Sequence, residues 1–146
     1  MAAEKHHINW DPHFDLGIPV IDHDHRHMVE LVNAVYDACE RHQWDKTIEH
    51  AMYELSLFTV QHFNHEEEIM VSRHYPEMLD HIKAHRKLAE QLDAISDRIV
   101  RDGAAAIDET IGDFLYNWLI GHIKHDDYEL AQFYLHPPRQ EKVLGP

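Results

Sequence analysis

The chain has 146 residues, which is enough for one domain with a real core but not for a second domain of ordinary size. Its 13 basic and 27 acidic residues give a formal net charge of −14 with histidines neutral, and this charge argues against nucleic acid or an anionic membrane as a partner. No charge-free apolar run is long enough to span a bilayer and the amino terminus has no apolar signal core, so we expect a cytoplasmic protein without membrane insertion.

The first 21 residues are predicted to form an irregular arm that packs across the rest of the domain. Pro12, Gly17 and Pro19 interrupt any helical repeat in this segment. Apolar side chains recur between them and give the arm a surface to bury. These side chains are Trp10, Phe14, Leu16, Ile18 and Val20.

Four amphipathic helices are predicted after the arm. In each, apolar side chains step by three and four residues, which is the period of one buried helix face. The links are short, so sequential helices run antiparallel. No segment alternates with a period of two, so strands are not expected. We therefore predict an all-α fold, an antiparallel up-down four-helix bundle, and treat residues 1–146 as a single domain with an arm at 1–21, a bundle at 22–134 and a tail at 135–146. The helices are expected at about residues 22–41, 45–72, 77–102 and 105–134.

Histidine is unusually frequent in these helices, and several histidines share the phase of the apolar stripe. A chain with 16 histidines also produces pairs spaced by four residues without any function, such as His23 with His27. Phase is the stronger evidence, because only side chains on the buried faces of several helices can converge. The residues that pass this test are His25, His62, Glu66, His81, His85 and His122.

Imidazole and carboxylate groups on four buried faces predict a metal site in the interior of the bundle. Without cysteine among them, these groups suit iron, zinc or manganese better than copper(I) or an iron–sulfur cluster. The carboxylate of the last helix is open from spacing alone. Asp126 lies four residues after His122 and would share its face, whereas Asp127 would lie about 140° away on an ideal helix. Gly121 or a one-turn π-bulge could supply the missing rotation.

The residues of this chain, taken in order, resemble those of the bacterial hemerythrins. The resemblance covers nearly the whole chain, and seven ligands at these separations are a specific signal, unlike any single pair. It rests on Trp10-Asp11-Pro12, Gly17-Ile18, Ile21-Asp22 with His25 and Asn33, His62-Phe63 with Glu66-Glu67, Tyr75-Pro76 with His81 and His85, and Trp118-Leu119 with His122-Ile123 and Asp127.

The resemblance implies reversible binding of dioxygen at a non-haem di-iron site. By matching position, His81, His85 and His122 would hold one iron. His25 and His62 would hold the other. Glu66 and Asp127, the family's choice over Asp126, would bridge the two irons together with an oxo or hydroxo ligand. The second iron would have one imidazole fewer and an open position for oxygen, beside an apolar wall made of Met28, Trp118, Leu119 and Ile123.

The ligand set favours oxygen carriage, storage or delivery to an oxygen-using enzyme over catalysis. Two carboxylates and five imidazoles leave less anionic charge on the irons than the four carboxylates of ferritin-like di-iron sites. We expect a protein that is not an enzyme, and a monomer. The alternatives are a di-iron enzyme that reduces peroxide or nitric oxide, and an oxygen or redox sensor. Of the side chains outside the ligand set, Glu67 and Glu68 are expected on a charged outer face, and Cys39 is expected to be a buried, inert thiol.

Overall fold

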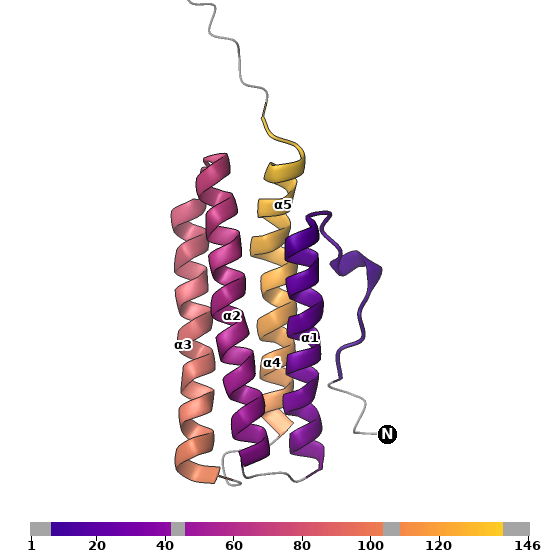
Figure 1. The fold of residues 1–146 in the computed structure, drawn as a ribbon, viewed down its shortest axis with the longest axis vertical. Helices are drawn as coiled ribbons and strands as arrows, with labels where there is room; N and C mark the ends of the chain where they lie inside the picture. Colours follow the sequence, from indigo (N-terminus) through magenta and orange to yellow (C-terminus); the bar gives the residue numbers. More distant parts are fainter. Residues whose placement is uncertain (1–6, 42–45, 104–108, 139–146) are drawn as a thin grey trace, which may run out of the picture.

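The computed structural model describes residues 7–41, 46–103 and 109–138, with the side chains of Glu109 and Thr110 left out. These ranges form four helical columns that run up and down beside one another (Figure 1). The first three columns are α1 (Pro19–Glu40), α2 (Lys46–Arg73) and α3 (Met78–Asp102). The fourth consists of α4 (Glu109–His122), a π-helical turn η4 (Ile123–Asp127) and α5 (Tyr128–Leu135). The predicted all-α four-helix bundle is confirmed, with no strand in the described ranges.

Two helix ends show how local chemistry sets the boundaries. α1 begins at Pro19, three residues earlier than predicted, because proline is well suited to the first turn, where its missing N–H is not needed. α3 ends at Asp102 as predicted, and Gly103 follows with a φ of 57° that favours glycine. The predicted helix starts at 45 and 105, and the tail after Pro138, lie outside the described residues.

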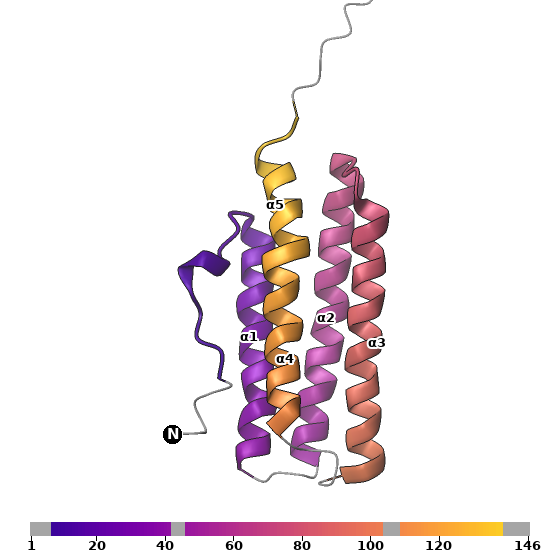
Figure 2. The ribbon, with the colours of Figure 1, turned by 180° about the vertical axis from the view of Figure 1, so that it is seen from behind.

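The arm lies along the outer side of α1, as Figure 2 shows from behind. Its backbone is held partly by a short 3-10 turn, η2 (Pro12–Phe14), in which the N–H of Phe14 donates to the carbonyl of Asp11 at 2.8 Å, and partly by side chains of α1. The N–H of Ile8 donates to Asn33 Oδ1 at 2.8 Å, and Asn33 Nδ2 donates back to the Ile8 carbonyl at 2.9 Å. Nearer the helix start, the N–H groups of Leu16 and Gly17 donate to the two oxygens of Asp22 at 2.7 and 3.0 Å.

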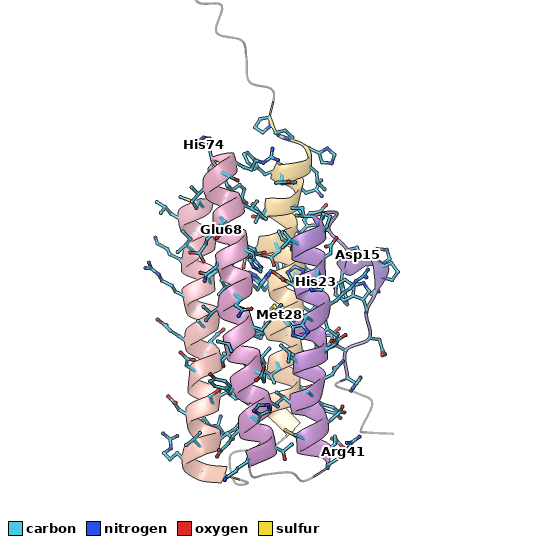
Figure 3. All side chains as sticks on the ribbon, viewed as in Figure 1. Asp15, His23, Met28, Arg41, Glu68 and His74 are labelled. Carbon is cyan, nitrogen blue, oxygen red and sulfur yellow. The ribbon has the colours of Figure 1, made fainter. Side chains whose placement is uncertain are left out.

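The buried apolar side chains form two clusters. α1 packs against α2 and α4, and α2 packs against α3. The small cluster surrounds the end of the bundle where α1 begins and α2 ends, and it consists of Leu16, Ile18, Ile21, Met70, Tyr75, Leu130 and Ala131. The large cluster fills most of the remaining interior and includes Met28, Val32, Leu55, Leu92, Leu115, Leu119 and Ile123. Figure 3 shows His74 at one end of the bundle and Arg41 at the other, with Met28 between them.

A layer of buried polar side chains separates the two clusters. The order of residues along the helices places the polar side chains there. On α1, His25 lies between Ile21 of the small cluster and Met28 of the large one. On α2, His62 and Glu66 lie between Leu55 and Met70 in the same way. No helix in the described part of the chain is both long and apolar enough to cross a membrane.

Candidate metal centre

The seven side chains predicted as ligands converge in this polar layer. All seven are at most 4% exposed. α1 contributes His25, α2 contributes His62 and Glu66, α3 contributes His81 and His85, and the fourth column contributes His122 and Asp127. Their donor atoms form two sets, and within each set the atoms lie within 4.8 Å of one another. The larger set is Glu66, His81, His85, His122 and Asp127; the smaller set is His25, His62, Glu66 and Asp127.

The two carboxylates belong to both sets, and their contacts show how they connect them. Glu66 Oε1 lies 2.8 Å from the Nε2 atom of His85 in the larger set, while its other oxygen, Oε2, lies 3.4 Å from Nε2 of His62 in the smaller set. Asp127 Oδ2 lies 2.6 Å from Nε2 of His25 and 3.0 Å from Nε2 of His122. Each carboxylate therefore contacts imidazoles of both sets.

The π-helical turn decides which aspartate of the fourth column enters the layer. A π turn holds one residue more than an α turn, and here the N–H of Tyr128 donates to the carbonyl of Ile123. This extra residue supplies the rotation that an ideal helix lacks, so Asp127 is fully buried while the side chain of Asp126 is 38% exposed. The π turn is one of the two sources of rotation considered in the sequence analysis. Spacing on a regular helix, which would have placed Asp126 on the face of His122, does not describe this segment.

Charge within the layer is strongly coupled. Burial and the Asp127 charge act to raise the pKa of Glu66, but the imidazoles of His62 and His122 outweigh them and hold that pKa well below its usual value. Burial likewise acts to raise the pKa of Asp127, and His122 and His25 outweigh it. The imidazoles respond in the opposite sense. Burial acts to lower the pKa of His81, but the two carboxylates raise it to about 9. The imidazoles thus hold the two carboxylates in the charged form.

Several polar atoms of the layer have no hydrogen-bond partner among the described residues. They are His25 Nδ1, His62 Nε2, Glu66 Oε2, His122 Nε2 and Asp127 Oδ1. Unpaired buried polar atoms cost free energy, and folded proteins leave few of them. Four of these five atoms, all except His25 Nδ1, are oxygens of the shared carboxylates or imidazole nitrogens that face those carboxylates. Imidazole nitrogens and carboxylate oxygens without partners are the donors that iron, zinc or manganese accept, so the residues fit a bound metal.

Two carboxylates that the sequence analysis did not predict for the site accept hydrogen bonds from the Nδ1 atoms of its histidines. The Nδ1–H of His62 donates to Asp24 at 2.9 Å, and that of His85 donates to Glu67 at 3.1 Å. Glu67 therefore does not belong to a purely outer charged face; Glu68, which is exposed, does. A signal for Asp24 was present, since it shares the stripe of Ile21 and Met28. Glu67 gave no such signal, because it follows Glu66 and lies off the buried stripe of α2.

Aromatic and aliphatic side chains pack beside the polar layer. Phe63, another residue not predicted for the site, stacks on the ring of His85 with centroids 3.9 Å apart and planes 10° apart. The four residues predicted as an apolar wall are all at most 5% exposed and belong to the large cluster: Met28, Trp118, Leu119 and Ile123. The indole N–H of Trp118 donates to the carbonyl of Leu88 at 3.0 Å. That bond occupies the one polar group of the wall side chains that could donate to a ligand.

Comparison with known proteins identifies similar chains. The family model of the hemerythrin HHE cation binding domain matches residues 16–134. The chain is 32% identical over 126 residues to a bacteriohemerythrin of Pseudomonas paraeruginosa, which covers 83% of this chain and 77% of that protein. It is 28% identical over 125 residues to a bacteriohemerythrin of Clostridium acetobutylicum, and this match covers 82% of this chain and 95% of that protein. A hemerythrin-like protein of Naegleria gruberi is 29% identical over 120 residues, and this match covers 82% of this chain and 87% of that protein.

Proposed function

The chain belongs to the hemerythrin family of HHE cation binding domains, and we propose that it binds dioxygen reversibly at a non-haem di-iron site. The observation that carries this proposal is the pair of buried donor sets that share Glu66 and Asp127. One shared carboxylate alone would suit a single ion with a charged neighbour. Two carboxylates shared by two sets are the arrangement that holds two cations close together.

The assignment of residues follows from the two sets. His81, His85 and His122 would hold one iron, His25 and His62 the other, and Glu66 and Asp127 would lie between them. Imidazole and carboxylate donors suit iron in this setting, and the absence of cysteine from both sets argues against copper(I). A bound pair of ferrous ions supplies the electrons that reversible oxygen binding requires. The smaller set has one imidazole fewer, which leaves room there for a small ligand.

The protein's own contribution is an apolar wall whose side chains have no free proton donor. Leu119 and Ile123 are at most 1% exposed and flank His122 on the fourth column. Trp118 has its N–H engaged by a backbone carbonyl, so this wall offers no proton donor to a bound ligand. A wall without a proton donor would not assist irreversible oxidation of bound irons, which favours reversible binding of oxygen.

We further propose carriage, storage or delivery of oxygen to an oxygen-using enzyme as the role of this binding. All seven donors come from one chain, so a monomer suffices for the site.

The test is optical and uses three states of one sample. The fully reduced protein should gain a visible absorption band when exposed to oxygen and lose it when oxygen is removed. Metal analysis of the same sample should give about two irons per chain. An enzyme would behave differently: it would consume peroxide or nitric oxide over many turnovers with a supplied reductant, and deoxygenation would not restore the reduced spectrum. Irreversible oxidation together with such turnover would overturn the carrier function.

A further inference from the structure

Asp24 is a buried carboxylate that belongs to neither donor set but touches one of them. It lies on α1 directly before His25, and it is 2% exposed. One of its oxygens, Oδ2, accepts from the Nδ1–H of His62 at 2.9 Å and from Nδ1–H of His65 at 2.7 Å. Both histidines lie on α2, so this single oxygen ties the two helices together at the edge of the polar layer. His65 is partly exposed and continues the contact toward solvent.

The smaller donor set depends on Asp24 more than the larger set depends on its own outer carboxylates. The larger set has two such partners: Glu67, on His85 at 3.1 Å, and Asp126, on His122 at 3.4 Å. Their side chains are 34% and 38% exposed, so water screens their charge, whereas the side chain of Asp24 is 3% exposed. In the smaller set His25 Nδ1 has no partner among the described residues, which leaves Asp24 as the support seen for this set.

We propose that Asp24 is the positioning residue for the metal ion of the smaller set, and that His65 braces the Asp24 carboxylate. The inference rests on the proposed two-metal centre. A histidine binds a metal through Nε2 only when its proton is on Nδ1, and a carboxylate that accepts this proton fixes both the tautomer and the orientation of the ring. It also makes Nε2 a better donor. The His65 contact holds the same oxygen from the other side, so the carboxylate keeps its direction toward His62.

The consequence is a second asymmetry between the two ions, beyond the unequal numbers of imidazoles in the two sets. Loss of Asp24 should weaken one ion and leave the other unaffected, because His62 belongs to the smaller set alone. Loss of an outer carboxylate of this kind typically lowers metal affinity by about 10- to 100-fold.

The experiment uses the protein loaded with Co²⁺ and measures the rate at which Co²⁺ leaves after excess chelator is added. The visible absorption of bound Co²⁺ reports its release. Asp24→Asn keeps the shape and one acceptor oxygen but removes the charge, and Asp24→Ala removes both. We expect half of the bound Co²⁺ to leave about 10- to 100-fold faster in Asp24→Ala, less so in Asp24→Asn, and the other half at the wild-type rate. Glu67→Gln is the matched control and should leave the rate of the Asp24-dependent half unchanged. His65→Ala should speed the same half to a smaller extent.

Each other outcome overturns a definite part of the inference. Equal acceleration of both halves would show that Asp24 supports the bundle in general. Unchanged release in both Asp24 variants would show that it does not position His62. An effect of the Asp24 variants without any effect of His65→Ala would show that His65 does not hold the Asp24 carboxylate in position. Wild-type protein that binds a single Co²⁺ would overturn the two-metal centre and this inference with it, and the stoichiometry distinguishes that result from the others. Circular dichroism of the variants verifies that each is folded.

Discussion

Replacing Glu66 by glutamine removes the charge from an oxygen pair that serves both donor sets. The larger set keeps His81, His85, His122 and Asp127, whereas the smaller set falls to three donors, His25, His62 and Asp127. A neutral amide bridges two cations poorly, so we expect the ion of the smaller set to be lost and metal content to fall from about two to about one per chain.

The loss should also appear in thermal stability. A metal present at about 100 times its dissociation constant stabilises the folded state by about 2.7 kcal/mol. For a chain of this size each kcal/mol corresponds to about 2–4 °C, so the Tm of metal-loaded Glu66→Gln should lie roughly 5–11 °C below that of the wild type. Glu68→Gln is the control, because Glu68 lies on the same helix but is exposed.

Metal analysis of protein made in iron-replete cells and calorimetry of the same samples provide the measurements. Equal metal content in the two variants would refute the reasoning, whether both kept two ions or both lost one, because it would show that Glu66 has no special place between the sets. A large fall in Tm with full metal content would mean that Glu66 stabilises the bundle without bridging metals.

Three further outcomes are expected. Asp127→Asn should lose metal while Asp126→Asn keeps it, because the π turn buries only Asp127; metal analysis showing the reverse would contradict this geometry. Leu119→Ser should shorten the lifetime of the oxygenated form in stopped-flow measurements, because its hydroxyl can bring a proton to the site. Leu119→Ala is its control, since both truncations cost about 2–5 kcal/mol of stability and only one adds a donor; equal lifetimes would mean that polarity there is unimportant. Burial and the Glu40 charge raise the pKa of the Cys39 thiol to about 11, so alkylation at pH 8 should be roughly 100-fold slower than for an ordinary thiol and should quicken with rising pH. Mass spectrometry of iodoacetamide-treated protein measures this rate, and fast alkylation of the folded chain at pH 8 would show that the thiol is not suppressed.

The sequence predicted the bundle and most of the polar layer because both follow from one periodicity. His81 and His85 continue the apolar stripe of their helix, so the argument that buries Met78 and Leu92 also turns the two imidazoles inward. The same reasoning holds for His62 with Glu66. Where the helix is regular, the face of a side chain can be read from its position.

The remainder could not be read in this way, for two reasons. At Asp127 the helix is not regular, and the π turn moves the buried position by one residue, which spacing on an ideal helix cannot anticipate. Asp24, Glu67 and Phe63 depend on partners on neighbouring helices, and the contact of Asp24 with His62 spans 38 residues of sequence. Periodicity gives the face that a residue occupies; it does not give the register of one helix against the next.

The polar layer divides the interior into two hydrophobic compartments of unequal size, and this division affects how the fold opens. The small compartment joins α5 and the last turns of α2 to the start of α1, and the histidines and carboxylates of the layer lie between it and the large compartment. Such a boundary lets the smaller part open as its own cooperative unit. Cations held between the four columns would join the two compartments. Occupancy of the metal centre would therefore determine whether the protein unfolds in one step or in two.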